Sequence, residues 1–424
     1  MLDINLVREN PQFMKDNEKR RERDPKIVDE VLTLDDNWKK QLKKVETLKH
    51  TRNVVSMEIN KLKKEGKNIK PKIKEMQEVA QNIKKGEDKA IELLERRNQT
   101  LLKLGNIIHE KVPKGKDDSE NVEIKAWGKK PKFNFPIKNH VELCESLNLA
   151  DFDASAKVSG NGFYYLKNEL GLLNQALIHF AIDFMRSKHY DYIEPPLLIK
   201  KEVLGAAVDV NEFGKSIYSI ENEDLALIGT SEHALLGLHR DEAIFEKDLP
   251  KKYFSYSMCF RKEVGAHGIN EKGLWRTHQF NKVEQFIFCS PEDSEKYFAE
   301  LLQNSEEILQ ALGLPYRVLE ICTGDLALWK NRSHDIDVWR PTTESYGEVM
   351  SLSNCTDYQA RKLDIKVIDT NNKRKVLHTL NNTALATSRI MVAILENFQT
   401  KEGTVKVPKV LWPHMNGITE IGKK

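Results

Sequence analysis

The sequence predicts an α+β protein in which an N-terminal antiparallel α-helical hairpin precedes a larger domain of helices and antiparallel strands. Two observations support this fold class. Residues 34–108 carry two runs with a 3.5-residue apolar repeat, and aromatic-rich, strand-like runs appear only after residue 133. With 424 residues and roughly 150 residues per domain, two or three domains are expected. We expect a helical arm over residues 1–112, a linker over 113–135 and the mixed domain over 136–424.

The two apolar repeats predict the helices of the arm. The first is apolar at seven of nine positions, which are Leu34, Trp38, Gln41, Val45, Leu48, Arg52, Val55, Ile59 and Leu62. The second is apolar at nine of eleven positions, which are Ile73, Met76, Ala80, Ile83, Glu87, Ala90, Leu94, Arg97, Leu101, Leu104 and Ile108. Gly66 and Pro71 between the runs favour a turn. The arm is therefore predicted to be an antiparallel coiled-coil hairpin.

The arm is strongly basic, although the whole chain has a net charge of only +3. Residues 39–86 contain fifteen Lys or Arg and five acidic residues, so this window carries +10 and the rest of the chain −7. A solvated dimerisation coil is one interpretation, because Lys-rich helix faces are often plain surface. The alternative is that the arm binds a polyanion. The phosphates of a polyanion would relieve the repulsion among the Lys and Arg side chains, and each contact would also release counterions. Since nothing in the arm is suited to reading bases, we expect it to bind an RNA or DNA backbone.

Composition argues against a membrane protein and against a disulfide framework. No stretch approaches the ~20 apolar residues that a membrane-spanning helix needs. The first five residues form neither a basic flank nor an apolar run, so no signal peptide is expected. The five cysteines form no C-x-x-C pair. We expect a cytoplasmic protein with no membrane partner.

The elements of the second domain follow from its patterning. Residues 112–119 are polar, contain helix breakers and are expected to end the arm. Apolar spacing predicts a helix over 172–188, and residues 192–198 are typical of a strand whose prolines place it at an edge or interface. Residues 253–261 and 276–288 predict an antiparallel hairpin around a Gly-bearing loop. The sequence contains neither of the Gly-rich phosphate-binding motifs of the common nucleotide folds.

Two polar clusters lie in this predicted hairpin. Arg261 and Glu263 stand two apart on a strand and so share a face, although charges at a strand end are most often solvated. Phe280 and Glu284 are four apart on the return strand and also share a face. Phe280 could stack on a base while the carboxylate binds an amine, or it could be ordinary core.

Two more clusters follow toward the C-terminus. Glu348 and Ser351 offer two oxygen ligands, and Mg²⁺ favours one or two protein oxygens together with substrate phosphates. Residues 384–395 are nearly apolar all round, which predicts a buried helix with Arg389 as its only charge. A buried Arg requires an anion, either a protein carboxylate or a bound phosphate. Residues 380–383 would supply polar side chains at the entrance of this helix.

In this order the clusters resemble the three motifs of class II aminoacyl-tRNA synthetases. Motif 1 is similar to residues 172–196, motif 2 to 260–263 and 276–280, and motif 3 to 380–389. The similarity is closer still to the seryl-tRNA synthetase family, at residues 158–166, 278–280, 353–361 and 395–399. The resemblance covers essentially the whole chain. It implies a class II catalytic domain, built as an antiparallel sheet flanked by helices, in a homodimer formed through motif 1.

The resemblance also implies a reaction and its partners. Members of the family activate L-serine with ATP to seryl-adenylate and transfer the serine to the 3′ end of serine tRNA. Mg²⁺ would be the cofactor, and the coiled-coil arm would bind the long variable arm of that tRNA.

Residue by residue, the resemblance implies overlapping sites. The ATP site would comprise Arg261, Lys262, Glu263, Arg276, Thr277, Phe280, Glu348, Val349, Met350, Ser351 and Arg389. The serine site would comprise Thr230, Ser231, Glu232, Arg261, Glu284, Asn381 and Thr383. Arg261 and Arg389 would be the catalytic residues, and Glu348 and Ser351 would hold Mg²⁺.

The family gives most of the nucleotide-binding residues a specific role. Arg261 would bind both the α-phosphate and the serine carboxylate. Glu263 would accept a hydrogen bond from the adenine amino group, with Phe280 stacked on the ring and Arg389 on its other side, near the γ-phosphate. Arg276 would support the β- and γ-phosphates, and Thr277 beside it would supply only backbone contacts.

The resemblance also implies roles for the serine-binding residues. The chain departs from the family pattern at two places. Thr230 and Glu232 would bind the ammonium group, and Glu284 and Thr383 would surround the hydroxyl. Asn382 stands where the family often has Gly, which would tighten the serine pocket. The motif 2 loop over 264–275, with His267 and Trp275, is particular to this chain, so contacts with the tRNA acceptor end are not carried over.

Three rival functions fit the sequence less well. A class II synthetase of another specificity would usually carry an anticodon-binding domain after motif 3, but only 35 residues follow Arg389. A non-catalytic tRNA-binding paralogue should lack phosphate-binding residues such as Arg261 and Arg389, which are present here. Enzymes of this type that charge carrier proteins lack the long arm.

Overall fold

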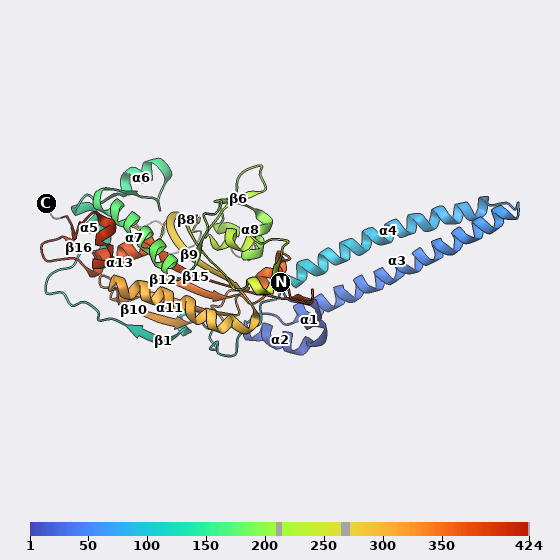
Figure 1. Ribbon diagram of the computed structural model, residues 1–424, viewed down its shortest axis with the longest axis horizontal. Coiled ribbons are helices and arrows are strands. Elements are labelled where there is room, and N and C mark those ends of the chain that lie inside the picture. Colours follow the sequence, from blue (N-terminus) through green and yellow to red (C-terminus); the bar gives the residue numbers. More distant parts are fainter. Residues whose placement is uncertain (209–213, 264–271, 423–424) are drawn as a thin grey trace. The chain divides into compact units, whose positions relative to one another are not determined.

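The computed structural model describes residues 1–208, 214–263 and 272–422 and divides into two compact units, Met1–Gly105 and Asn106–Lys424 (Figure 1). The predicted α+β class is confirmed, because the regular elements of the first unit are all helices and the second unit is built on a mainly antiparallel sheet. Within the described ranges, no helix is long and apolar enough to cross a membrane.

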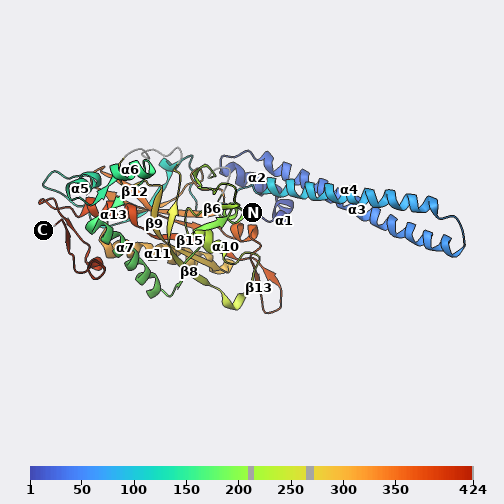
Figure 2. The ribbon, with the colours of Figure 1, turned by 90° about the horizontal axis from the view of Figure 1, so that it is seen from above.

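The first unit is the predicted coiled-coil hairpin on a short helical base. Its helices are α1 (Ile4–Glu9), α2 (Pro11–Arg20), α3 (Lys26–Lys64) and α4 (Lys70–Leu101). Figures 1 and 2 both show α3 and α4 side by side as an antiparallel pair. Both predicted repeats contribute buried seam residues, among them Leu34, Val45 and Val55 of α3 and Ile83 and Ala90 of α4. The 3.5-residue repeat therefore predicted the pairing of the two helices correctly.

The second helix of the hairpin ends earlier than the sequence predicts. α4 stops at Leu101, whereas the apolar repeat continues to Ile108. The backbone N–H of Gly105 donates to Glu18 Oε1 at 2.9 Å, and a Cβ on Gly105 would lie 2.5 Å from the side chain of Arg21. The chain after α4 thus turns against the base of this unit, a tertiary contact that a local repeat cannot reveal.

A charged residue is buried inside the first unit. Asp35 of α3 is 1% exposed and pairs with Arg8 at 2.7 Å, Lys39 at 2.8 Å and Arg97 at 3.1 Å. Arg97, a polar position of the second repeat, also lies 5.1 Å from the centre of the Trp38 ring. Burial alone would raise the pKa of Asp35, but the hydrogen bonds from these three cations hold it well below its ordinary value of 3.8.

We expect Asp35→Asn to lower the free energy of unfolding by about 3 kcal/mol at neutral pH, because the cations around it lose their shared carboxylate. Since the pKa of Asp35 is lower in the folded than in the unfolded chain, its contribution is complete above the ordinary value of 3.8 and is lost as the pH falls below it. Urea denaturation should therefore separate the two proteins at neutral pH and bring them together in acid. Asp36→Asn, at an exposed neighbour, is the matched control. Equal stability of Asp35→Asn and wild type at neutral pH would contradict this role.

An eight-stranded sheet forms the centre of the second unit. In spatial order its strands are β1 (Val122–Trp127), β10 (Tyr316–Glu320), β11 (Arg332–Arg340), β12 (Ser345–Asn354), β15 (His378–Ala386), β9 (Gln279–Cys289), β8 (Lys251–Phe260) and β4 (Asp191–Tyr192). Neighbouring strands are antiparallel, except that β4 pairs with β8 in parallel. The smaller sheets consist of β2 (Ala150–Asp151) with β3 (Tyr165–Leu166), β5 (Leu198–Lys200) with β6 (Leu225–Leu227), β7 (Ala243–Phe245) with β13 (Lys366–Ile368) and β14 (Arg374–Lys375), and β16 (Val405–Lys406) with β17 (Glu420–Ile421).

The helices of the second unit fall into two groups, one that encloses the main core and one that encloses a second, smaller core. They are α5 (His140–Ser146), α6 (Phe152–Ser159), α7 (Asn168–Ser187), α8 (Lys201–Ala207), α10 (Glu232–Gly237), α11 (Ser294–Leu312), α12 (Tyr358–Lys362) and α13 (Thr387–Asn397). The predicted helix over 172–188 corresponds to α7, and the predicted hairpin to β8 and β9. Helix α11 lies along the sheet (Figure 1), where its Ser305 bonds to Gln285 of β9 and Asn382 of β15. Side chains alternate along a strand, so the neighbours of these two residues face away from α11.

Residues 113–135, expected to be a linker, belong to the second unit. Strand β1 pairs with β10 at the edge of the large sheet, from Val122 opposite Glu320 to Trp127 opposite Tyr316. The polar stretch before it is bonded to the turn after β10, where Thr323 Oγ1 accepts from the Gly115 N–H at 3.2 Å. The helix breakers and polar side chains that predict a linker are thus used in tertiary hydrogen bonds.

Residues 380–386 form a strand, not the entrance and first turn of a helix. β15 extends to Ala386 and α13 begins only at Thr387. Leu380 pairs with Ile287 of β9, and the residues that follow continue the pairing. Only residues 384–386 of the predicted helix belong to the strand, and a short apolar run of this kind does not distinguish the end of a buried strand from a buried helix.

Candidate active site

A cavity of about 430 Å³ lies in the second unit, over the side of the sheet that faces away from α11. Strands β9, β12 and β15 supply its floor, and the segments around residues 229–233, 260–263, 275–277 and 327–330 supply its walls. The cavity collects most of the residues that the family resemblance assigns, namely Thr230, Glu232, Arg261, Glu263, Arg276, Thr277, Phe280, Glu284, Glu348, Val349, Ser351, Asn381, Thr383 and Arg389. These residues come from distant parts of the chain and meet only through the fold of the sheet.

The floor of the cavity is polar because alternate side chains of neighbouring strands point into it. Phe280 and Glu284 of β9 both line it, as their spacing predicts, and Lys282 lies between them. On the neighbouring strand Thr383 pairs opposite Glu284, and its hydroxyl donates to Glu284 Oε2 at 3.4 Å. Asn381, two residues earlier, donates to Glu284 Oε1 at 3.1 Å. Two strands thus present their polar residues to the same space.

A β-bulge brings the two predicted magnesium ligands together. Glu348 and Ser351 are three apart, which in a regular strand would place them on opposite faces. The register between β11 and β12 shifts next to Asp337, which pairs with Glu348, and Val349 is left as the extra residue. The bulge turns the chain so that Glu348, Val349 and Ser351 all line the cavity.

Arg389 of α13 finds its anion in the protein. Its Nη1 donates to the Glu348 backbone oxygen at 2.6 Å and to Glu348 Oε2 at 3.1 Å, and its Nε donates to the Trp275 backbone oxygen at 3.3 Å. The side chain is 21% exposed, so it is half-buried and not buried as the helix pattern predicts. The cavity wall partly desolvates the Glu348 carboxyl, but the charge and hydrogen bond of Arg389 hold its pKa below the ordinary value. Of the two anions considered on the sequence, the structure contains the carboxylate.

Arg261 and Glu263 reach the cavity from the turn after β8, beyond the end of the strand, and not by alternation along it. The Arg261 guanidinium lies 5.3 Å from the centre of the Phe280 ring, and its Nε donates to the Gly229 backbone oxygen at 3.1 Å. Glu263 has a φ of 50°, a left-handed conformation that is uncommon outside Gly, and its carboxylate pairs with Arg276 at 2.7 Å. The turn therefore aims these charges at one opening.

A second group of charges lies deeper and is dominated by carboxylates. Glu232 accepts from Gln359 Nε2 at 2.9 Å and from Asn381 Nδ2 at 3.1 Å. Its pKa is raised, mainly by burial and further by the nearby Glu284. Glu284 is fully buried and pairs with Lys282 at 2.5 Å. Because Lys282 is engaged by Glu284, the partly buried Glu232 carboxylate is stabilised best by a cation that enters the cavity.

Three residues assigned by the resemblance do not line the cavity. Lys262 lies 5.5 Å from the centre of the Tyr218 ring, Ser231 is fully buried beside the cavity wall, and Met350 is part of the main core. Asn382 faces α11, where its Nδ2 donates to the Leu301 backbone oxygen at 2.8 Å. The expectation that Asn382 tightens the serine pocket is therefore wrong, since alternation along β15 points it away.

The motif 2 loop is only partly described. His267 and the rest of residues 264–271 lie outside the described residues. Gly273 and Trp275, at the return end of that loop, are described, and Trp275 lines the cavity.

No motif predicted two residues of the cavity lining, Lys282 and His233, or Asp335 of the neighbouring strand β11. Lys282 could have been found from its place between Phe280 and Glu284, but a Lys at alternating spacing is usually solvated. His233 is buried, and burial together with the nearby Arg261 lowers its pKa to about 3, so the ring is neutral at physiological pH. Asp335 pairs opposite Ser351, and burial and Glu348 raise its pKa to about 7. Neither His233 nor Asp335 belongs to a local sequence pattern. The charged residues that shift their pKa values, Arg261 and Glu348, come from other segments of the chain.

The arrangement combines an arginine cluster (Arg261, Arg276 and Arg389) with a carboxylate cluster (Glu232 and Glu284) in one cavity. Fixed guanidinium groups stabilise phosphate charge, particularly charge that develops during displacement at phosphorus. Carboxylates that are partly or fully withdrawn from water favour an ammonium group. A substrate pair that brings phosphates and an amine together fits such a cavity.

Comparison with known proteins agrees with this chemistry. The seryl-tRNA synthetase N-terminal domain matches residues 1–108, and the tRNA synthetase class II core domain (G, H, P, S and T) matches residues 216–398. The chain is 44% identical to a serine–tRNA ligase of Methanocella arvoryzae over 99% of each chain.

Solved structures of the same kind superpose on the whole chain. A crystal structure of seryl-tRNA synthetase from Pyrococcus horikoshii complexed with ATP is 42% identical and has a TM-score of 0.93, with 99% of each chain covered. The cytoplasmic serine–tRNA ligase of Naegleria fowleri in complex with AMP is 33% identical and has a TM-score of 0.89, with 99% of this chain and 98% of that one covered. With a matching N-terminal arm, a matching core and full-length relatives at this identity, the chain belongs to the seryl-tRNA synthetase family.

Proposed function

We propose that this protein is an enzyme that activates L-serine with ATP to seryl-adenylate and transfers the serine to the 3′ end of serine tRNA. The observation that carries the proposal is the single cavity in which the arginine cluster and the carboxylate cluster meet. Full-length relatives that are named serine–tRNA ligases support the choice of amino acid.

The arginine cluster would hold ATP. Arg276 and Arg389 suit the terminal phosphates, and Arg261 suits the α-phosphate, where it can also bind the serine carboxylate. Phe280 offers a ring face to the adenine, and Glu263 an acceptor for its amino group. Glu263 pairs with Arg276 at 2.7 Å, so the two side chains are ordered before a nucleotide arrives.

Mg²⁺ fits the bulged wall of the cavity. Glu348 and Ser351 would supply oxygen ligands from the cavity wall. Asp335 pairs opposite Ser351, and its Oδ1 is buried without a hydrogen-bond partner among the described residues. Among the residues that the structure describes, no three acidic, His or Cys side chains form a metal-binding cluster, so an ion here would take its other ligands from phosphate and water. When bound, Mg²⁺ would neutralise phosphate charge.

The carboxylate cluster would select serine. Glu232 is partly buried and desolvation raises its pKa, and a substrate ammonium group would stabilise its charge. Glu284 and Thr383 face the same space, and Glu284 is fixed by Asn381 and Lys282, so its remaining lone pairs are oriented toward a small hydroxyl group. A larger amino acid side chain would meet this polar floor without matching it.

The two chemical steps follow from this placement. The serine carboxylate attacks the α-phosphorus in line, a P–O bond forms, and pyrophosphate leaves with the electron pair of the broken bond while Arg261 and Arg389 stabilise the developing charge. A terminal ribose hydroxyl of the tRNA then attacks the adenylate carbonyl, and AMP leaves. No side chain need act as a covalent nucleophile.

The coiled-coil arm would bind the tRNA by its backbone. Its +10 window lies on two helices whose lysines are mostly exposed. Phosphate contacts by such residues would be independent of sequence and sensitive to salt.

A homodimer through motif 1 is the proposed assembly. The elements of that motif expose Leu172 of α7 and Tyr192 of β4, which are 42% and 40% exposed, and Leu198 of the strand directly after the motif is 42% exposed. Burying them against a second copy would remove this apolar surface from water.

Charging assays test the function directly. Labelled serine should become acid-precipitable in the presence of ATP and a serine tRNA transcript, and omission of ATP or tRNA should remove the signal. A chain that binds this tRNA but esterifies no amino acid to it would be the non-catalytic alternative.

A further inference from the structure

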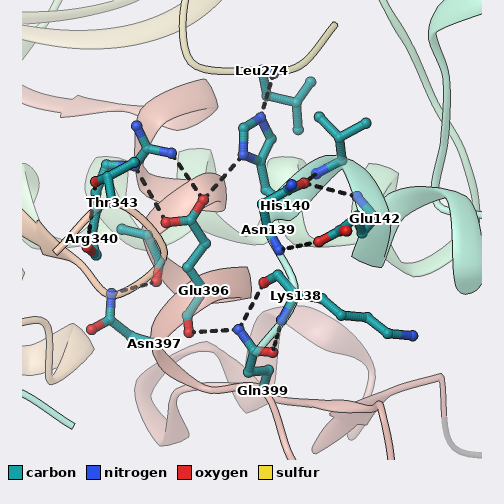
Figure 3. Close-up of polar contacts among 12 residues, drawn as sticks. Lys138, Asn139, His140, Glu142, Leu274, Arg340, Thr343, Glu396, Asn397 and Gln399 are labelled. Carbon is teal, nitrogen blue, oxygen red and sulfur yellow. Dashed lines mark hydrogen bonds and ion pairs between the residues drawn. The ribbon is translucent and has the colours of Figure 1, made fainter. Parts of the chain in front are cut away.

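A buried histidine fixes the return end of the motif 2 loop. His140 opens helix α5, whose N-terminus is capped by the Asn139 side chain (Figure 3). The Leu274 N–H donates to His140 Nε2 at 3.2 Å, so the ring proton lies on Nδ1, which is 3.1 Å from Glu396 Oε1. A Cβ on Gly273 would lie only 2.5 Å from His140 Nε2, and its φ of +145° is one that side chains rarely adopt. The chain at residues 273–274 is thus held against α5.

The same carboxylate fixes an arginine on the other side. Glu396 of α13 is fully buried and accepts from Arg340 Nη2 at 2.9 Å and Arg340 Nε at 3.3 Å (Figure 3). Burial would raise the pKa of Glu396, but its hydrogen bonds with His140 and Arg340 hold it below the ordinary value. The carboxylate therefore stays charged, and it anchors Arg340 by two hydrogen bonds.

Arg340 and Arg389 both contact Trp275. The Arg340 guanidinium lies 4.3 Å from the centre of the Trp275 ring, and that of Arg389 lies 5.4 Å from it. Arg389 also donates to the Trp275 backbone oxygen. Gly347 leaves room for the ring, since a Cβ there would lie 2.4 Å from Trp275 Cζ2. One indole thus links an arginine inside the cavity to one outside it.

We propose that Arg340 is a positioning residue for ATP binding, which acts through Trp275 on Arg389. Arg340 does not line the cavity, yet with Glu396 and His140 it fixes the ring and backbone against which Arg389 rests. Arg389 then enters the reaction with its orientation set, which lowers the entropy lost when a triphosphate binds. The inference rests on the proposed function, in which Arg389 contacts ATP.

The first test compares two arginines of the same strand. Arg340→Met should raise the KM for ATP in pyrophosphate exchange and the Kd for ATP in equilibrium dialysis by about tenfold, the size of a partly buried cation–π contact. The KM for serine should stay unchanged. Arg332→Met is the matched control, because Arg332 at the other end of β11 also pairs with a carboxylate, Glu320, and lies 5.0 Å from the Phe298 ring, but does not contact Trp275. It should leave both ATP constants unchanged.

Three further variants separate positioning from a general loss of packing. Arg340→Lys should restore much of the ATP affinity because it keeps a cation at the ring. Arg340→Met in a Trp275→Leu background should raise the KM for ATP no further, since the link is already broken. Gly347→Ala, which displaces the ring without removing a charge, should reproduce the Arg340→Met result and decides the matter if Arg340→Met does not fold.

Two results would overturn the inference. One is unchanged ATP affinity in both Arg340→Met and Gly347→Ala, and the other is an equal rise in the KM for serine. Absence of serine-dependent exchange in the wild type would instead refute the proposed function, and the dialysis measurements of ATP would still test the link.

Discussion

Arg389→Ala should reduce serine-dependent ATP–pyrophosphate exchange by at least about a thousandfold, the effect expected when a guanidinium that stabilises phosphoryl transfer is removed. Arg389 is held by Glu348 and Trp275 at the cavity wall, so its charge is in place before the substrate binds. Its loss also leaves the Glu348 carboxylate without the cation that keeps its pKa low. Adenylate formation should therefore fail even at saturating ATP.

The arm offers a control within the same molecule, because binding of serine tRNA should be unchanged in Arg389→Ala when measured by filter retention. Arg374→Ala, at an exposed position of β14, is the matched substitution and should behave like the wild type. Exchange at the wild-type rate in Arg389→Ala would refute its catalytic role. Loss of tRNA binding would point to misfolding and would be checked by circular dichroism.

Neutralising lysines at the tip of the arm should impair tRNA charging and spare adenylate formation. This is the reverse of Arg389→Ala, which should lose adenylate formation and keep tRNA binding. Replacing the exposed Lys61, Lys63, Lys64 and Lys74 with Gln should raise the KM for tRNA in charging by about tenfold or more and leave serine-dependent exchange unchanged. The salt dependence of tRNA binding should also become shallower, by roughly one unit of slope for each phosphate that the arm no longer neutralises.

The matched control neutralises four exposed lysines of the second unit, Lys247, Lys373, Lys401 and Lys409. These substitutions remove the same charge from the chain and should leave the KM for tRNA nearly unchanged. An equal effect of both sets would mean that total charge, and not the arm, attracts the tRNA. Unchanged charging in the arm variant would contradict the proposed role of the coiled coil.

Features that depend on local periodicity were predictable from the sequence. The 3.5-residue repeat predicted the pairing of α3 and α4, and the spacing of Phe280 and Glu284 placed both on the cavity floor. These predictions hold because a helix seam and a strand face are determined by residues close in sequence. The same logic failed at residues 384–386, where the apolar end of a buried strand runs into an apolar helix and the pattern does not mark the boundary.

Features that depend on pairing between distant segments were not predictable. The bulge at Val349, which places Glu348 and Ser351 on one wall, is visible only as a register shift between β11 and β12. The partner of Arg389 remained undecided between phosphate and carboxylate for the same reason. Arg340 and Trp275 are 65 residues apart in a chain whose sequence gives no sign that they stack.

Pyrophosphate exchange with each of the twenty amino acids tests the central claim most directly, since it reports the cavity's chemistry without the arm or the tRNA. The carboxylate cluster, with Glu284 fixed by Asn381 and Lys282, predicts that serine stimulates exchange far above every other amino acid. Threonine-stimulated exchange equal to or above that with serine, or no stimulation by any amino acid, would contradict the account.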